Sequence, residues 1–175
     1  MNNRYLPPEP LSVRHEFSNF RCRSSEQTQW LHRYALQSAS TGTTRVFVVT
    51  GHQDEKVVAY YAWCMAQINP RIAPEPLRKG GGRYPQPIAL LARLGVDTDH
   101  EGRGLGTGLL QDVFTRLIEL SEDIGCRGLL VHAESTAARE FYLHLVPEFE
   151  TSPTDDLHLV LLMKDIRQAM RVLET

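Results

Sequence analysis

The chain has 175 residues, 42% of them hydrophobic and 23% charged, with a formal net charge of −2. This length fits a single domain, 1–175, and the composition excludes a disordered, collagen-like or coiled-coil chain. No apolar run approaches the ~18 to 20 residues needed to cross a bilayer, the first residues lack the layout of a secretory signal, and three cysteines are too few for a disulfide framework. We therefore expect a protein of the reducing cytoplasm, with Cys64 and Cys126 as buried free thiols.

The first half of the chain predicts an extended segment, a helix and a hairpin. Residues 1–10 are rich in proline and are expected to be extended. Over 24–37, apolar residues recur at helical spacing behind two serines that can cap the helix. The runs 43–50 and 56–68 flank a short turn and predict a hairpin. The segment 69–86 holds four prolines and three consecutive glycines, and loops of this length in compact domains are commonly functional.

The second half alternates strands and helices. Residues 88–96 are apolar almost throughout, as a strand covered on both faces would be. A glycine-rich turn follows, and an apolar stripe predicts a helix from Leu105 to near Gly125. Strands are expected at 129–131 and 157–163, with a helix between them that Ser135 caps and a short helix at the end. The order predicts a mixed α/β fold with a central sheet flanked by helices.

Charge is distributed unevenly along the chain. Residues 1–93 hold 12 Lys and Arg against 6 Asp and Glu, whereas residues 94–175 hold 7 against 15. Such a split favours a basic face for an anionic partner, and chance placement of surface charge is the alternative.

The most informative segment is the glycine-rich turn between the strand 88–96 and the following helix. Glycines let successive backbone amides converge, and the N-terminus of a helix carries about half a positive charge, so the turn can hold a phosphate or pyrophosphate. The dinucleotide fingerprint G-x-G-x-x-G would need glycine at Thr107 or Leu109, and the P-loop would need a following Gly-Lys-Ser/Thr. Neither pattern is present.

This turn, Glu101-Gly102-Arg103-Gly104-Leu105-Gly106, resembles the Q/R-x-x-G-x-G/A motif of the GNAT superfamily of acyl-CoA N-acyltransferases. The resemblance implies a GNAT-like fold and acetyl-CoA as acetyl donor, with its pyrophosphate on the backbone of the turn and its pantetheine on the preceding strand. Glu101 departs from the usual Gln or Arg, and Arg103 is the nearest charge expected to compensate it. The implied cofactor-binding residues are Leu94, Gly95, Val96, Arg103, Gly104, Leu105, Gly106 and Thr107.

Further matches narrow the resemblance. Residues 131–134 and 138–142 are similar to the second conserved strand and helix of the family. This similarity places Tyr142 at the position where members of the family frequently have their general acid. These matches and others extend over about residues 8–150. Taken together, they make the chain resemble the GNAT toxins of bacterial toxin–antitoxin pairs. That resemblance implies acetylation of the α-amino group of aminoacyl-tRNA, a ribbon-helix-helix antitoxin as partner, and a homodimer.

The chemistry is plausible for these residues. The amine of an esterified amino acid has a pKa below the roughly 7.7 to 8.0 of a peptide α-amine, so it needs little help from a general base, and no carboxylate stands out as one. A tyrosine can donate its proton to a thiolate, although Tyr142 beside Phe141 on an amphipathic helix also fits a core residue. Phosphate contacts are expected from Arg78, Lys79 and Arg83 around the glycine loop, and from Arg93.

Other residues favour structural roles. Trp30 is expected to pack and His132 to lie in the core. Asp97, Asp99 and Glu101 alternate like a metal loop, but the remainder of a calcium loop is missing, so no metal is expected. Two functional alternatives stay open: an acetyltransferase of a small amine or protein N-terminus, and a non-catalytic module that binds acyl-CoA or a partner.

Overall fold

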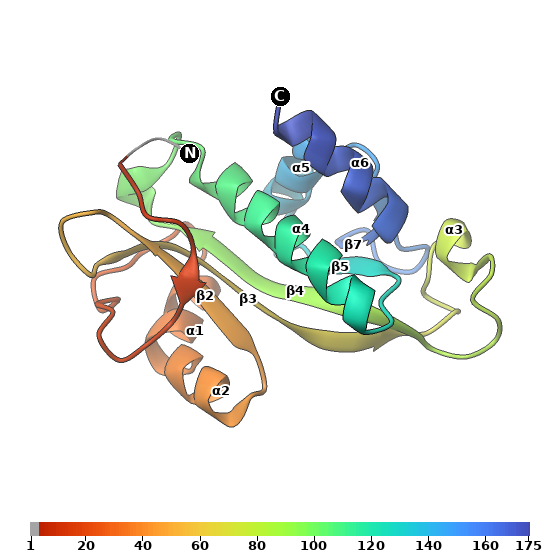
Figure 1. The fold of residues 1–175 in the computed structure, drawn as a ribbon, viewed down its shortest axis with the longest axis horizontal. Coiled ribbons are helices and arrows are strands. Elements are labelled where there is room, and N and C mark those ends of the chain that lie inside the picture. The colour runs from red at the N-terminus through yellow and green to blue at the C-terminus, as the bar shows by residue number, and fades with distance from the viewer. Residues whose placement is uncertain (1–3) are drawn as a thin grey trace. The chain divides into compact units, whose positions relative to one another are not determined.

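The computed structural model describes residues 4–175, and these form two compact units. Unit 1 contains the chain up to Cys64 together with Ala92–Asp112, and unit 2 contains Met65–Leu91 and Val113–Thr175. The chain passes between the units inside three elements, β3 (Val57–Ile68), β4 (Gln86–Val96) and α4 (Leu105–Asp123). The strand order of the sheet is β1-β2-β3-β4-β5-β7-β6 (Figure 1).

Unit 1 is built on the predicted hairpin. Strand β2 (Arg45–Thr50) pairs antiparallel with β3 on one side and with β1 (Glu9–Pro10) on the other. Two helices, α1 (Ser25–Arg33) and α2 (Ala35–Thr41), belong to the same unit. The hydroxyl of Ser24 caps α1 by accepting from the Gln27 amide at 3.1 Å, as predicted. Leu31, Val48 and Tyr60 are fully buried in the core of this unit.

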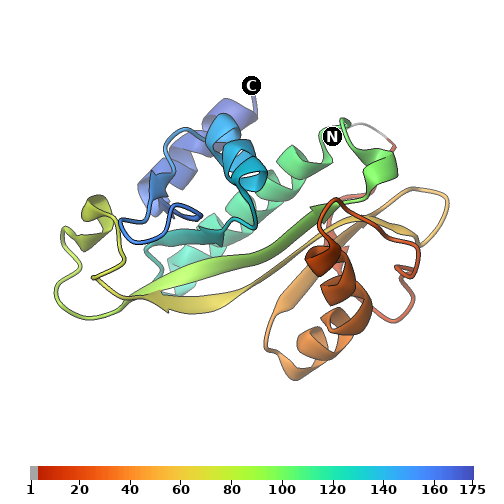
Figure 2. The ribbon, with the colours of Figure 1, turned by 180° about the vertical axis from the view of Figure 1, so that it is seen from behind.

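Unit 2 contains the parallel part of the sheet. Ala89–Leu91 of β4 pair in parallel with β5 (Gly128–His132), which pairs antiparallel with β7 (His158–Leu162). The short edge strand β6 is Glu150–Thr151. Helix α5 (Thr136–Leu145) is capped by Ser135 as predicted, and α6 (Met163–Leu173) packs against β5 and β7. Figure 2 shows these elements from behind. The arrangement confirms the predicted mixed α/β class.

Several elements differ from the sequence-based expectation. The predicted helix 24–37 is two helices, because Tyr34 has φ −121° and ψ −21°, outside the helical region. The two-residue strands β1 and β6 lie in segments without strand periodicity, and a four-residue helix, α3 (Glu75–Arg78), interrupts the predicted loop 69–86. Strand β4 is buried only at Ile88, Ala89, Leu91 and Gly95, so it is not covered evenly on both faces.

Three buried-residue predictions also need correction. His132 is exposed rather than in the core, because it is the last residue of β5. Its ring stacks on the ring of His158, with 3.9 Å between the two ring centroids. Cys64 and Cys126 are free thiols as expected, but each is only half-buried.

Across residues 4–175, none of the helices is long and apolar enough to span a membrane.

Candidate functional site: a glycine turn and a buried tyrosine

The glycine-rich turn leaves space in front of its backbone. Gly102 has φ 71° and Gly104 has φ 80°, in the left-handed region that favours glycine. A Cβ built on either residue would meet nothing within 4 Å, so this side of the turn is open. A ligand can therefore approach the backbone of the turn closely.

Three amides at the start of α4 are available to such a ligand. Near this end, the Gly108 amide donates to the Gly104 carbonyl at 2.9 Å. The amides of Leu105, Gly106 and Thr107 precede it and have no acceptor within the helix. They lie at the positive end of a 19-residue helix, where an anion is stabilised by both the amides and the helix dipole. The backbone therefore fits the pyrophosphate of acetyl-CoA.

Gly95 in β4 is required by packing within unit 1. An added Cβ would lie 3.2 Å from Cε1 of Tyr60 and 3.3 Å from Sγ of Cys22. Side chains alternate along a strand, so Leu94 and Val96 project to the opposite face, where both are half-buried. Of the three predicted pantetheine-binding residues, only these two have side chains that can line the pantetheine.

The charge of Glu101 is compensated by Arg23 and not by Arg103, contrary to expectation. Nε and Nη2 of Arg23 donate to Oε1 and Oε2 of Glu101, both at 2.9 Å. This bidentate pair neutralises the acid that stands where the family motif usually has Gln or Arg. Arg103 is exposed, and its guanidinium instead donates to the hydroxyl of the buried Tyr5 at 2.9 Å.

Tyr142 lies on α5 in unit 2 with its ring enclosed. The residue is 6% exposed. The rings of Phe141 and Phe149 contact the Tyr142 ring edge-on, with ring centroids 5.2 and 5.9 Å from its own. Burial, and then the negative charge of Glu134, raises the pKa of Tyr142 above the usual value for tyrosine. The hydroxyl forms no hydrogen bond with any residue in the described range, and that range contains no fully enclosed polar side-chain atom without a partner. The hydroxyl therefore reaches solvent and keeps its proton at neutral pH.

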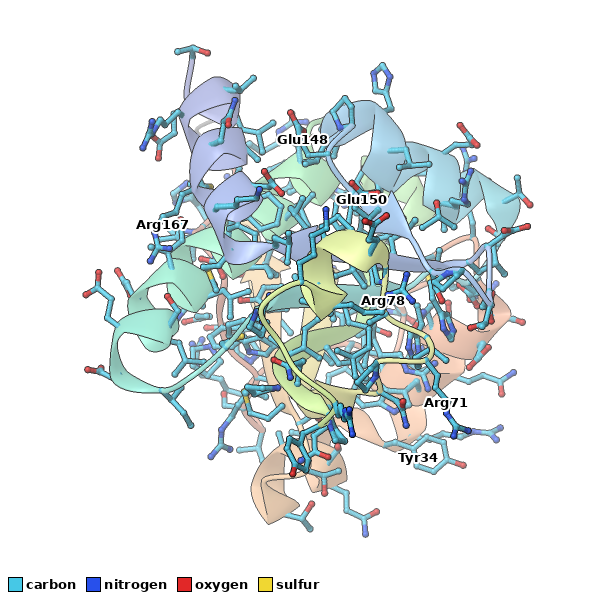
Figure 3. All side chains as sticks on the ribbon, turned by 90° about the vertical axis from the view of Figure 1, so that its right-hand side faces the viewer. Tyr34, Arg71, Arg78, Glu148, Glu150 and Arg167 are labelled. Carbon is cyan, nitrogen blue, oxygen red and sulfur yellow. The ribbon has the colours of Figure 1, made fainter. Side chains whose placement is uncertain are left out.

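Three of the four predicted phosphate-binding residues lie together. Arg78, Lys79 and Arg83 are exposed on the segment between β3 and β4 in unit 2, where Arg71 also projects (Figure 3). Lys79 pairs with Glu75 at 3.3 Å, an exposed ion pair of little strength.

Buried anchors hold this segment in place. Leu77 is fully buried, and Nη2 of Arg127 donates to the carbonyls of Leu77 and Lys79 at 3.3 and 3.4 Å. The basic side chains therefore project from a segment whose backbone is anchored to the rest of unit 2.

Arg93, the fourth predicted residue, belongs to unit 1 and is already engaged. Its guanidinium bonds Glu26 at 2.9 Å and lies over the ring of Trp30, 5.5 Å from the centroid. Trp30 itself stacks on Tyr60, which confirms its predicted packing role. The charge split along the chain does not follow the units, because unit 1 holds nine basic and nine acidic residues and unit 2 holds ten and twelve.

The acidic residues near the turn have structural roles. The carboxylate of Asp97 accepts from the Arg21 amide at 3.1 Å and from the Asp99 amide at 2.9 Å. Within residues 4–175, the only group whose ligand atoms converge is Glu9, His15 and Glu55. Arg14 bonds both of those carboxylates, so this group is an ion-pair cluster and not a metal centre.

Sequence reasoning missed Arg23 and Tyr5. Their partners, Glu101 and Arg103, lie 78 and 98 residues away along the chain, and no local pattern connects such positions.

Comparison with known proteins decides the family. The profile of the acetyltransferase (GNAT) family matches residues 12–145. The chain belongs to this family. It is 39% identical over 163 residues to the tRNA-acetylating toxin of Mycobacterium tuberculosis, covering 93% of this chain and 95% of the relative. The predicted GNAT resemblance is thus confirmed, and acetyl-CoA is the acetyl donor that this family uses.

Solved structures show the same fold at low sequence identity. AtaT complexed with acetyl-methionyl-tRNAfMet aligns with a TM-score of 0.84 at 20% identity, over 94% of this chain and 98% of that chain. A tyrosine-to-phenylalanine mutant of the toxin AtaT bound to the C-terminus of the antitoxin AtaR aligns with a TM-score of 0.79 at 20% identity, over 94% and 96%. These matches confirm the GNAT fold.

Proposed function

We propose that this protein is an N-acetyltransferase that moves the acetyl group of acetyl-CoA to the α-amino group of aminoacyl-tRNA and thereby blocks translation as a toxin. The observation that carries the proposal is the 39% identity with a tRNA-acetylating toxin over nearly the whole length of both chains. The fold shared with AtaT, which is solved with acetyl-methionyl-tRNAfMet, supports it.

We take residues 1–175 as one catalytic domain. The chain crosses between its two units inside β3, β4 and α4. Because each crossing lies within a hydrogen-bonded element, neither unit is a continuous stretch of chain that could fold independently.

The residues at the turn are suited to acetyl-CoA. The amides of Leu105, Gly106 and Thr107 would hold the pyrophosphate, and Leu94 and Val96 would line the pantetheine beside the backbone of Gly95. Bound in this way, acetyl-CoA supplies an acetyl thioester. The Glu101–Arg23 pair removes the main objection to this binding, since the acid near the turn is neutralised.

Tyr142 is the residue we assign to the leaving group. When the neutral amine attacks, a carbon–nitrogen bond forms, the carbon–sulfur bond breaks, coenzyme A leaves as its thiolate, and the amine releases one proton to solvent. A thiol has a pKa of about 8.5, whereas burial raises the pKa of Tyr142 above the usual value for tyrosine. Tyr142 therefore stabilises the departing sulfur mainly as a hydrogen-bond donor that keeps its own proton.

The acceptor would be held largely by charge. Arg78, Lys79 and Arg83 are exposed on one segment of unit 2, and we assign them to phosphates of the tRNA, with Arg93 as a further contact. Affinity that rests on phosphate contacts falls steeply as salt is added, whereas transfer to a small amine would not.

The partners follow from the same assignment. A mutant of the toxin AtaT is solved bound to the C-terminus of the antitoxin AtaR, and we propose an antitoxin partner for this chain, of the ribbon-helix-helix type. We also propose a homodimer, and a cytoplasmic location because charged tRNA is found there.

The decisive experiment is transfer of radiolabelled acetyl from acetyl-CoA to bulk charged tRNA, with deacylated tRNA and free amines as other acceptors. We expect label on charged tRNA alone. Tyr142→Phe should reduce the rate by about 10²-fold or more, the usual cost of removing one hydrogen-bond donor that stabilises developing negative charge. Tyr34→Phe is the matched control, because Tyr34 is an exposed tyrosine, and it should leave the rate unchanged.

Other outcomes would change the assignment. Label only on small amines would leave an ordinary acetyltransferase and reject the tRNA acceptor. No label on any acceptor, with folded protein, would favour the non-catalytic module. An equal rate for Tyr142→Phe and the wild type would reject the role of Tyr142 and leave it as a core residue.

A further inference from the structure

Two imidazole rings at the end of β5 form a stack that has no role in the function described so far. His132 ends β5, and His158 is its partner across the antiparallel pairing with β7. Their ring centroids are 3.9 Å apart and their planes differ by 14°, so the rings lie face to face. His132 is exposed, so a ligand can reach its ring.

His158 is the anchored member of the stack. Its amide donates to the carbonyl of Asp155 at 3.1 Å, and its Nε2 lies 3.4 Å from Oδ2 of the same residue. Its own carbonyl accepts from the amide of Ser152 at 2.8 Å, and Ser152 is buried. The exposed ring of His132 therefore rests on a partner that is held in place.

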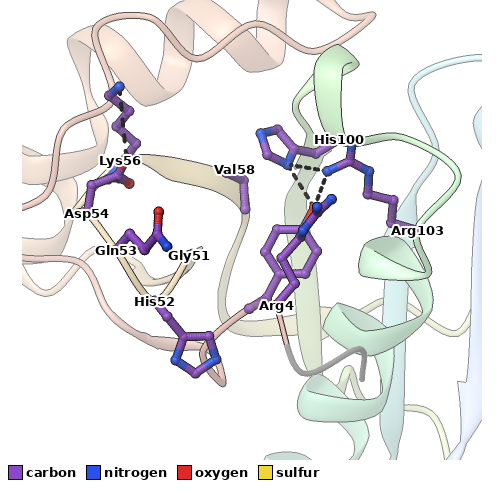
Figure 4. A pocket seen from close by; sticks show the side chains of 10 residues that line it. Arg4, Gly51, His52, Gln53, Asp54, Lys56, Val58, His100 and Arg103 are labelled. Atoms are coloured by element: carbon purple, nitrogen blue, oxygen red, sulfur yellow. Dashed lines mark hydrogen bonds and ion pairs between the residues drawn. The ribbon is translucent and has the colours of Figure 1, made fainter.

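A second histidine contact, in unit 1, is of another kind. The rings of His100 and Tyr5 meet edge-on, with 5.7 Å between their centroids, and Nδ1 of His100 lies 2.8 Å from the Tyr5 hydroxyl. His100 lines a cavity there together with Arg103, which belongs to the turn already assigned to acetyl-CoA (Figure 4). That contact orients polar groups, whereas the stack in unit 2 presents a flat aromatic surface.

His132 carries little charge at neutral pH. Partial burial, and then the positive charge of His158, lower the pKa of His132 below the usual value for histidine, and the carboxylate of Asp155 opposes this change. The ring is therefore mostly the neutral imidazole at pH 7. A neutral ring is suited to stacking against a flat ligand and attracts phosphate only weakly.

The stack lies on the sheet face that the basic segment covers. Because side chains alternate along a strand, His132 shares a face with Leu130, which belongs to the same core cluster as Leu77 of α3. The hydroxyl of Ser152, whose amide bonds to the strand of the stack, donates to the carbonyl of Ile72 at 2.9 Å. The stack therefore adjoins the segment whose basic side chains we assign to tRNA phosphates.

The stack also lies where the reaction is expected. Strands β4 and β5 pair in parallel, and ligands of α/β sheets bind beyond the carboxyl ends of such strands. His132 is the last residue of β5, and the helix that carries Tyr142 begins at Thr136. His132 thus adjoins the basic segment and leads into the helix that carries the proposed donor to the leaving group.

We infer that the His132–His158 stack is a platform for the unpaired 3′-terminal base of the acceptor tRNA, with His132 in contact with the base and His158 as a positioning residue. The inference rests on the proposed function, which supplies charged tRNA. The amino acid is esterified to the terminal nucleotide, so the base of that nucleotide is close to the reacting amine. Unpaired RNA bases stack on aromatic side chains, histidine included.

The test is steady-state acetylation of charged tRNA at varied tRNA concentration. His132→Ala should raise KM about fivefold to 150-fold, the range that corresponds to one stacked base, and leave kcat unchanged because only binding is lost. His132→Phe keeps a flat ring and should hold KM near the wild-type value. His144→Ala, at an exposed histidine of α5, is the matched control and should behave as the wild type.

The same assay at varied salt separates stacking from phosphate binding. Stacking on a neutral ring releases no counterions, so the salt dependence of KM should be the same in His132→Ala as in the wild type. Arg78→Gln, at a residue assigned to phosphate, should make that dependence shallower.

Other results would overturn the inference. If His132→Phe is as impaired as His132→Ala, the ring nitrogens and not the flat ring are needed, and stacking is rejected. A shallower salt dependence in His132→Ala would make His132 a phosphate ligand. Equal KM values for His132→Ala and His144→Ala would leave the stack without a role in binding while the proposed function stands. Wild-type protein that acetylates no charged tRNA would reject the proposed function, and the inference with it.

Discussion

Gly95 offers the sharpest test of how the end of β4 is built. An added Cβ would lie 3.2 Å from Cε1 of Tyr60, 3.3 Å from Sγ of Cys22 and 3.5 Å from Cζ of Phe20. Tyr60 cannot move aside, because it is fully buried and its hydroxyl donates to the Gln27 carbonyl at 2.6 Å. Gly95→Ala therefore overpacks unit 1.

The expected cost follows from two opposing effects. Overpacking a core by a methyl group costs about 1 to 3 kcal/mol, and replacing glycine with alanine recovers about 0.4 to 1 kcal/mol through the unfolded chain. The net loss is thus about 0 to 2.6 kcal/mol, with a midpoint of about 1.3 kcal/mol. For a chain of this length each kcal/mol lowers Tm by roughly 2 to 4 °C, so the midpoint corresponds to a fall of about 3 to 5 °C.

The assay is thermal and urea unfolding of Gly95→Ala beside Gly125→Ala, whose added Cβ would meet nothing within 4 Å. The double variant Cys22→Ala/Gly95→Ala should recover part of the loss, because it removes one of the three close contacts. If Gly95→Ala and Gly125→Ala unfold at the same temperature, the packing explanation for this glycine is wrong.

Two further predictions concern stability. Leu77→Ala should lower the free energy of unfolding by about 2 to 5 kcal/mol, since Leu77 is fully buried and anchors α3 in the core of unit 2. Urea unfolding measures this loss. A loss no larger than that of Leu120→Ala, at an exposed leucine, would contradict the prediction. Hydrogen bonds from His15, and secondarily Arg14, lower the pKa of Glu9. A carboxyl group whose pKa is lower in the folded state than in the unfolded state stabilises the fold at pH values above its unfolded-state pKa. This stabilisation is lost as the pH falls through the folded-state pKa. Unfolding between pH 6 and 3 should therefore depend less on pH in Glu9→Gln than in the wild type, and parallel pH profiles would refute the role of Glu9.

Much of the fold could be predicted because its signals are local. A serine before an apolar stripe begins α1 and α5, since its hydroxyl satisfies an amide that the helix cannot. The hairpin β2–β3 follows from two β-branched or apolar runs around a short turn. The open turn before α4 follows from its glycines, because Gly102 and Gly104 adopt backbone angles that other residues resist.

Only the tertiary structure decided which side chains act together. Arg23 neutralises Glu101, and Tyr5 holds Arg103, across separations of 78 and 98 residues, where sequence patterns carry no information. The raised pKa of Tyr142 likewise comes from its enclosure and from Glu134. Backbone conformation responds to neighbours along the chain, so the sequence by itself determined most of the elements and the glycine-rich turn before α4. Charge compensation and pKa depend on neighbours in space, so those properties of the site exist only once the chain has folded.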